Sequence, residues 1–342
     1  MRTSDPRHCV LPREPRSPRG GLTRRQFFAS LGAVAGAGLI APYLGRLERE
    51  RLASVEVSRP GLGTWIRIVA RDGDRGRAER AIERAFAAIA RVDDEMSIHR
   101  ATSEISGVNR AAGRAAVPVS PALLEVLAIA DAAALRSGGM YDPTVLPLMR
   151  LYGFYGNTAS GPYPSDRAIA DVLDRTGWSQ VQLDRAAGTL GLTRSGAGID
   201  LGSIGKGWAV DRAVAALREA GIRSGLVDIG GNVYGLGVPE DGAVGWSVGV
   251  FHPVTGRVDR VFVLRDNAVA TSANTEQFRI LSGTRVGHLF DARRGRPASG
   301  HLSASTQAPT GVESDVMSTS AFVLGPDGFR GWPNVIDAHF IG

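Results

Sequence analysis

The apolar residues of this chain follow two different spacings, one typical of strands and one typical of helices. Residues 55–70 alternate between apolar and polar side chains, which predicts two strands joined by a turn around Pro60 and Gly61. Residues 81–92 carry apolar side chains three and four positions apart, which predicts a helix with one buried face. The same reasoning predicts further helices over 121–137, 206–220 and 314–324, and strands over 181–200 and 226–290.

Residues that start and stop helices support these boundaries. Ser120 is an N-cap residue followed by Pro121 at the first helical position, and a pair of glycines at 138–139 ends that helix. Gly221 ends the helix that precedes it. Because the strands gather in runs and do not alternate regularly with helices, we expect an α+β fold. It would be a single large mixed domain over 55–342, with predominantly antiparallel sheets and packed helices.

The composition is that of an ordinary globular protein, with 43% hydrophobic and 22% charged residues in a chain of 342. The formal charge of +6 would suit a protein that binds nucleic acid, but this charge is concentrated at the N-terminus. Residues 1–25 contain seven arginines and two acidic residues, and so account for five of the six positive charges. The remainder is nearly neutral and has no basic stripe, so we expect no nucleic-acid partner.

The basic leader resembles an export signal. Arg24 and Arg25 precede a moderately apolar run of small residues that is too short to span a bilayer comfortably, an arrangement typical of the twin-arginine route. We therefore expect a signal over 1–41 and a connector over 42–54. The mature protein would be periplasmic or on the outer side of the cytoplasmic membrane, with the signal as its only membrane contact. An ordinary N-terminal helix is the alternative reading.

Cysteine usage agrees with that division. The single cysteine, Cys9, lies within the expected signal, so the mature protein would contain no disulfide and no thiol chemistry.

Forty side chains are lysine or arginine, and Lys206 is the only lysine. Gly202, Gly205 and Gly207 surround it, and glycines let a backbone approach a ligand closely. Asp200 is expected to end the preceding strand, so Lys206 would open a helix whose N-terminus favours anions. A compact ammonium there suits a phosphate oxygen. The alternative is a lysine that survives by chance on a solvated face.

Two further segments are candidates for the same pocket. Residues 227–232 form a second glycine-rich turn, although such turns are often purely structural. Near the C-terminus, Asp315 and Thr319 lie four residues apart and would share one face of a helix. A carboxylate and a hydroxyl presented together are hard oxygen ligands that suit Mg²⁺. A capping or solvated pair is the alternative.

A histidine and a carboxylate occur together in the segment 287–295. His288 is a candidate general base, because the ordinary pKa of an imidazole lies near neutrality. Asp291 follows three residues later. A histidine that is simply packed in the protein is the alternative.

In their order along the chain, these segments resemble the ApbE flavin transferases, which are FAD:protein FMN transferases. The resemblance covers about residues 55–325. It rests on segments 96–106, 141–148, 199–207, 227–231, 268–272, 288–295 and 315–319.

The resemblance implies a reaction and a set of site residues. Such enzymes bind FAD and Mg²⁺ and transfer the FMN moiety to a threonine or serine hydroxyl of an acceptor protein, with release of AMP. Asp315, Thr319 and the backbone carbonyl of Ser203 are implied as Mg²⁺ ligands, and His288 as the base, which Asp291 would support. The implied FAD contacts are Lys206, Asp200, Met140, Tyr141, Asp142, His99, Leu62 and Leu289.

Several positions depart from the family pattern. Leu62 stands where a methionine is common, and His99 where a tyrosine usually stacks on a ring of FAD. Thr275 and Ala292 replace a common tyrosine and proline. None of these changes touches the expected metal or lysine positions, so we expect FAD binding to persist with altered affinity.

Two other function classes stay open on the sequence alone. A pyrophosphatase would use the same metal site with water as the acceptor and cleave FAD to FMN and AMP. A non-catalytic exported carrier would bind FAD and leave it intact. Whether AMP release requires an acceptor protein separates the first from a transferase, and persistent intact FAD identifies the second.

Overall fold

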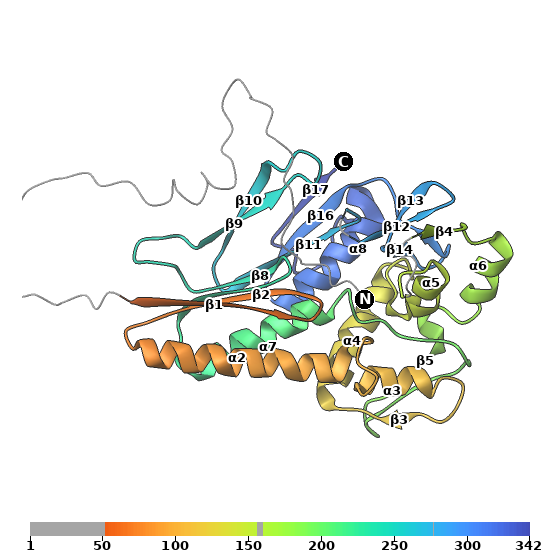
Figure 1. Ribbon diagram of the computed structural model, residues 1–342, viewed down its shortest axis with the longest axis horizontal. Helices are drawn as coiled ribbons and strands as arrows, with labels where there is room; N and C mark the ends of the chain where they lie inside the picture. Colours follow the sequence, from red (N-terminus) through yellow and green to blue (C-terminus); the bar gives the residue numbers. More distant parts are fainter. Residues whose placement is uncertain (1–51, 156–159, 276) are drawn as a thin grey trace, which may run out of the picture.

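The computed structural model describes residues 52–155, 160–275 and 277–342. At its centre is a seven-stranded sheet in which each neighbouring pair is antiparallel (Figure 1). In spatial order its strands are β1 (Ala53–Gly61), β2 (Thr64–Asp72), β7 (Ser224–Ile229), β8 (Asn232–Leu236), β11 (Asn267–Ala273), β16 (Ser303–Ala308) and β17 (Asp337–Ile341).

Both faces of this sheet are buried, because its strands alternate side chains between two cores. In β2, Ile66 and Ile68 belong to the larger core, whereas Val69 belongs to the core on the opposite face. Helices cover the first face: α2 (Arg75–Met96), α7 (Gly205–Glu219) and α8 (Gly311–Phe329), with α3 (Glu104–Arg110) and α4 (Pro121–Arg136) beside them. The hairpin of β9 (Trp246–Phe251) and β10 (Val258–Leu264) covers the other face.

A smaller lobe with its own core lies beside the sheet, on the right in Figure 1. Leu148, Tyr152 and Phe290 are buried at its centre. Its elements are β4 (Ser160–Gly161), α5 (Leu146–Leu151), α6 (Asp166–Leu173), β12 (Phe278–Leu281), β13 (Thr284–Gly287), β14 (Phe290–Asp291) and β15 (Arg296–Pro297). Short connecting elements are β3 (Val117–Pro118), β5 (Val181–Asp184), β6 (Thr189–Leu192), and the 3₁₀ turns η2 (Pro143–Val145) and η3 (Trp178–Gln180).

The predicted α+β fold with mainly antiparallel sheets is confirmed, and most predicted elements exist. Helix α4 begins as expected, with the Ser120 hydroxyl accepting a hydrogen bond from the backbone N–H of Leu123. The predicted turn around Pro60 and Gly61 is wrong by two residues. Both lie in β1, which is an edge strand where a proline is tolerated, and the turn falls on Leu62 and Gly63.

The predicted export signal over 1–41 lies outside the described residues, as does most of the expected connector over 42–54. Strand β1 begins at Ala53, two residues before the predicted start of the domain. Within the part of the chain that the structure describes, no helix is both long enough and apolar enough to cross a membrane.

Candidate functional site

The site is built on the crossing of α7 and α8. A Cβ atom on Gly207 would lie 2.2 Å from the carbonyl oxygen of Gly311, so the two helices touch through their backbones. This close approach brings the N–H of Gly207 to 2.8 Å from Oδ2 of Asp315. The first turn of α7 therefore directly binds the carboxylate predicted to hold Mg²⁺.

Lys206 lies beside this carboxylate. Its Nζ donates to the carbonyl oxygen of Gly202 at 2.9 Å and lies 3.9 Å from Oδ1 of Asp315. The side chain of Asp315 is only 5% exposed, and burial raises the pKa of this carboxyl above its usual range. Lys206, the Gly207 N–H and the side-chain amide of Asn232 oppose that shift. A buried carboxylate thus faces the ammonium of a side chain that is 31% exposed.

Two oxygen atoms at this site, one of them an expected Mg²⁺ ligand, have no hydrogen-bond partner among the described residues. The carbonyl oxygen of Ser203 accepts no hydrogen bond among the described residues, because α7 begins after it and Gly207 donates to Asp315 instead. The side-chain oxygen of Asn232, which reaches Asp315 through its amide, is buried and lacks a partner within those residues. Hard oxygen donors of this kind fit Mg²⁺ that retains waters.

The fit rests on mixed oxygen donors and not on a cluster of acidic side chains. In the described ranges, no three His, Cys, Asp or Glu side chains gather as a metal site. Asp315 and Thr319 do lie on α8 as predicted, both buried, but their role as metal ligands stays a prediction.

Asp200 reaches the site through a different local structure from the one predicted. It does not end a strand. The extended segment before it bonds to the side-chain amide of Asn109, which donates to the carbonyl of Ile199 at 2.9 Å and accepts from its N–H at 2.8 Å. The Asp200 carboxylate accepts hydrogen bonds from the hydroxyl of Tyr155 and from the N–H of Gly202, the latter at 2.9 Å.

Tyr141 also joins the site. The hydroxyl of Ser203 donates to the phenolic oxygen of Tyr141 at 3.2 Å, and burial raises the pKa of this tyrosine far above its usual range. The predicted FAD contact His99 packs edge-on against Tyr155, with ring centroids 5.5 Å apart. The ring of His99 is thereby placed next to the tyrosine that bonds to Asp200.

His288 faces the site from the smaller lobe. Burial is the main cause that lowers the pKa of its imidazole, and the charge of Lys206 lowers this pKa further. The carbonyl of Gln277, 3.2 Å from Nδ1, and the charge of Asp200 partly oppose that shift. The charges of Lys206 and Asp200 therefore act on this ring. The expected support from Asp291 is not found in the described contacts. The Asp291 carboxylate instead bonds to the backbone N–H of Arg293, 3.1 Å away, because it closes its own turn.

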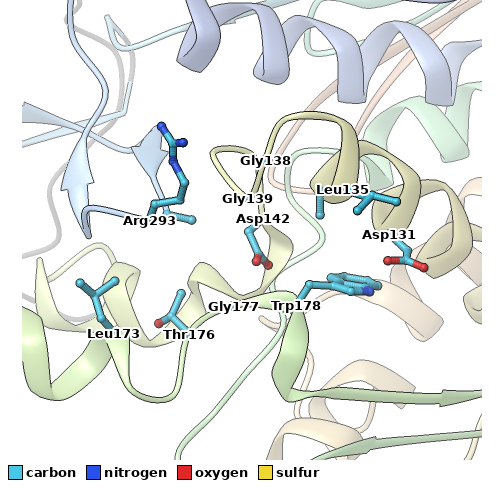
Figure 2. Close-up of a pocket in the computed structure, with 12 residues that line it drawn as sticks. Asp131, Leu135, Gly138, Gly139, Asp142, Leu173, Thr176, Gly177, Trp178 and Arg293 are labelled. Carbon is cyan, nitrogen blue, oxygen red and sulfur yellow. The ribbon is translucent and has the colours of Figure 1, made fainter.

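A cleft of about 370 Å³ is lined by one of the remaining predicted FAD contacts, Asp142. Figure 2 shows the Asp142 carboxylate between Gly139 and Gly177, with the indole of Trp178 on one side and Arg293 on the other. The carboxylate accepts from both the N–H and the hydroxyl of Thr144, at 2.8 and 2.7 Å, so part of its role is to cap η2.

Three other residues predicted to contact FAD lie outside the lining of this cleft. The carbonyl of Met140 accepts from the N–H of Ala292 at 3.1 Å, next to the cleft. Leu289 is buried, with its N–H bonded to the side chain of Asn274. Leu62 occupies the β1–β2 turn with a φ of 50°, a conformation that favours glycine.

The sequence reading gave no role to three residues that the structure brings to the site. Tyr155 bonds to Asp200, Asn232 reaches Asp315, and the hydroxyl of Ser272 lies 3.0 Å from that of Thr319. Ser272 lies in a segment that carried the family resemblance, and Asn232 ends the second glycine-rich turn, 227–232. Tyr155 had only a weak signal, an aromatic run at 152–155.

Comparisons with known proteins show which family the chain resembles. A family model described as the ApbE family matches residues 62–338. The FAD:protein FMN transferase of Treponema pallidum is 32% identical over 280 residues, which cover 76% of this chain and 76% of that protein. A transferase of the same name from Klebsiella pneumoniae is 30% identical over 252 residues, which cover 72% and 76%.

Solved structures give the same result. The ApbE protein of Thermotoga maritima superposes with a TM-score of 0.73 at 29% identity, covering 82% of this chain and 89% of that one. The flavin transferase ApbE from Vibrio cholerae superposes with a TM-score of 0.74 at 25% identity, covering 85% and 98%.

Proposed function

Because this chain belongs to the ApbE family, we propose that it transfers the FMN moiety of FAD to a threonine or serine hydroxyl of an exported acceptor protein, with Mg²⁺ and with release of AMP. The observation that carries this proposal is the meeting of Asp315, Lys206 and the free carbonyl of Ser203 at the start of α7. A pyrophosphate needs such a combination of cation and metal ligands.

Each group has a defined task in this reaction. Mg²⁺, held by Asp315, Thr319 and the Ser203 carbonyl, would neutralise charge on the pyrophosphate. The ammonium of Lys206 would bind a phosphate oxygen at the N-terminus of α7. The cleft beside Asp142 has the size and the aromatic wall to receive one ring system of FAD, and Met140, Tyr141, Leu289, His99 and Leu62 would complete the contacts.

The chemical step is a substitution at phosphorus. The acceptor hydroxyl oxygen forms a bond to the phosphorus of the FMN phosphate, and the bond from that phosphorus to the bridging pyrophosphate oxygen breaks. AMP leaves with that oxygen. His288, whose lowered pKa keeps the imidazole neutral near pH 7, would take the proton of the hydroxyl.

Mass spectrometry tests the activity directly. Full-length protein is incubated with FAD, Mg²⁺ and candidate exported proteins, and covalently attached FMN and free AMP are both measured. We expect AMP to appear together with FMN on an acceptor threonine or serine. AMP release without any acceptor would instead identify a pyrophosphatase, and FAD that stays intact under all conditions would identify a carrier.

An Asp315→Asn variant tests the metal assignment. The amide keeps an oxygen for the Gly207 N–H but loses the charge, so we expect turnover to fall at least about a hundredfold, while FAD binding weakens less. Asp327→Asn, a change at the C-terminal end of α8 beyond the kink at Gly325 and at a side chain that is 97% exposed, is the control and should retain activity. Equal activity of the two variants would refute the assignment.

We also propose that residues 1–41 direct export by the twin-arginine route, because Arg24 and Arg25 precede a short, moderately apolar run of small residues. Replacing both by lysine should retain the protein in the cytoplasm, as cell fractionation would show. Export that is unchanged by this double substitution would contradict the proposal.

A further inference from the structure

The hydroxyl of Thr319 behaves differently from its neighbours on α8. The hydroxyls of Ser314, Ser318 and Ser320 each donate to a carbonyl of their own helix, at 2.8 to 2.9 Å. This is the usual behaviour of serine and threonine inside a helix. Thr319 alone among these four donates to no carbonyl of α8 in the described contacts, and its hydroxyl instead lies 3.0 Å from that of Ser272 in β11.

Ser272 in turn lies 2.8 Å from the hydroxyl oxygen of Ser318. Four groups therefore form one hydrogen-bonded chain: the Thr319 hydroxyl, the Ser272 hydroxyl, the Ser318 hydroxyl and the carbonyl oxygen of Asp315, which the Ser318 hydroxyl reaches at 2.9 Å. A carbonyl oxygen can only accept, so the direction of the whole chain is fixed from that end.

The direction follows because each hydroxyl has one proton. Ser318 donates its proton to the carbonyl of Asp315, so it can only accept from Ser272. Ser272 thereby uses its own proton, so it can only accept from Thr319. The proton of Thr319 must therefore point at Ser272, and both lone pairs of its oxygen are directed elsewhere.

We propose that Ser272 is a positioning residue that prepares Thr319 as a metal ligand, by accepting its proton and turning its lone pairs toward Mg²⁺. This inference rests on the proposed function, which places Mg²⁺ on Thr319 and Asp315. The same chain ends on the backbone of Asp315, so one relay connects the two α8 residues assigned to the metal.

The relay has a physical consequence for binding. Without the acceptor at Ser272, Thr319 would rotate to donate to a carbonyl of α8, as its neighbours do, and its lone pairs would leave the metal direction. Groups that orient a metal ligand in this way typically contribute 10- to 100-fold to metal affinity.

Mg²⁺ affinity is the direct test. Mg²⁺ is titrated into the full chain at fixed FAD by isothermal calorimetry, for the parent, Ser272→Ala and Ser272→Thr. We expect Ser272→Ala to raise the Mg²⁺ dissociation constant about tenfold or more and Ser272→Thr to restore it. The metal-free melting temperature should change little, and the rate at saturating Mg²⁺ should fall less than the affinity.

A second pair of variants tests the direction of the relay. Ser318→Ala leaves Ser272 free to donate to Thr319 and should weaken Mg²⁺ binding, although Ser318 makes no hydrogen bond with Thr319 among the described contacts. Ser320→Ala is the matched control, since Ser320 is equally buried on α8 and donates to Val316. It should bind Mg²⁺ as the parent does.

The outcomes separate this inference from the proposed function. If the parent binds Mg²⁺ and Ser272→Ala binds it equally well, the positioning role is refuted and the transferase proposal stands. Equal affinities of Ser318→Ala and Ser320→Ala would refute the relay direction. If the parent itself shows no Mg²⁺ binding, both proposals fail.

Discussion

At the scale of single residues, the position of Lys206 depends on the size of an ammonium. Its Nζ fits between the carbonyl of Gly202 and the carboxylate of Asp315, at 2.9 and 3.9 Å. A planar guanidinium is larger and directs its donors as a fork. We therefore predict that Lys206→Arg lowers kcat/KM for FAD about tenfold or more.

Steady-state kinetics at saturating Mg²⁺ measures this effect. Arg212→Lys is the control, because Arg212 lies on the same helix over the ring of Trp208 and outside the proposed site. Full activity of Lys206→Arg would show that any positive charge suffices there.

The burial of His288 gives a prediction of pH dependence. A base must be neutral to accept a proton, and burial lowers the pKa of this imidazole below 6.5. The rate should therefore rise with pH through that lowered pKa and already be level near neutrality. Saturating Mg²⁺ keeps Asp315 ionised, so we assign the fall in rate at low pH, the acid limb of the profile, to protonation of His288.

The measurement is kcat/KM from about pH 5 to about pH 8 for the parent and for His288→Gln, which lacks a titrating ring. The variant should be slow and should lose the acid limb. If the rate of the variant falls at low pH as that of the parent does, a group other than His288 causes this fall.

Residue spacing predicted part of the site and could not predict the rest. Asp315 and Thr319 were found because four residues make about one helical turn, so the spacing alone fixes their common face. Tyr155 and Asp200 lie 45 positions apart, and their hydrogen bond depends on how the smaller lobe packs beside the sheet. No local pattern encodes such a contact.

At the scale of secondary-structure elements, the α7–α8 crossing determines where Asp315 lies. A methyl group on Gly207 would meet the Gly311 carbonyl and the Cβ of Asp315, at 2.2 and 2.6 Å. Gly207→Ala should therefore separate the helices and lower the unfolding free energy by about 1–3 kcal/mol. It should also break the Gly207–Asp315 hydrogen bond and so weaken Mg²⁺ binding.

Gly205→Ala provides a matched control for that prediction. Gly205 lies on the same helix, two residues earlier, and a Cβ there would meet nothing within 4 Å. Thermal unfolding and Mg²⁺ titration of both variants distinguish the two sites. Equal stability of the two would show that the helices can shift apart without cost.

The ends of helices were predicted well where capping residues determine them. The end of a strand was predicted poorly where a side chain, and not a neighbouring strand, bonds to the backbone. The Ser120 cap and the Gly221 stop, where φ is 85°, both confirm their predictions. The strand predicted to end at Asp200 is absent because the amide of Asn109 takes the hydrogen bonds that a neighbouring strand would supply. Asn109 lies 90 positions away from Ile199, beyond any window of sequence pattern.

At the scale of the whole molecule, the antiparallel sheet was predictable because its strands alternate, but its two-sided burial was not. Val69 is buried beneath β9–β10, and Ile68 is buried beneath the helices. The sequence shows that both are apolar and does not show which layer covers each. The position of the smaller lobe likewise follows from packing, and it is this lobe that carries His288.

Buried carboxyl groups determine how the stability of the whole molecule changes with pH. Asp211, which accepts from the N–H groups of Gly311 and Val312 at the start of α8, has its pKa raised by burial to about 6, from 3.8. Burial also raises the pKa of Asp142, Asp228 and Asp315. The folded protein then binds more protons than the unfolded chain between about pH 4 and pH 6.

This difference fixes the sign of the prediction. Stability falls as pH rises through that window, and Asp211 alone contributes a loss of about 3 kcal/mol between its two pKa values. The lowered pKa of Asp72, where the hydrogen bond from Arg77 and its charge outweigh burial, acts in the opposite sense only below about pH 4. The lowered pKa of His288 also acts in the opposite sense just below 6.5, but it is one group against the four carboxyls whose pKa values are raised. The metal-free protein should therefore be most stable in mildly acidic buffer.

Urea unfolding of the metal-free full chain, at intervals from about pH 4.5 to about pH 7.5, measures this profile. Asp211→Asn cannot ionise, so its unfolding free energy should vary less with pH, even though the amide loses one backbone hydrogen bond and lowers stability throughout. Asp327→Asn should leave the slope unchanged, since that side chain is exposed. A parent protein that becomes more stable from mildly acidic to neutral pH would show that these carboxyl groups are ionised in the fold at little cost.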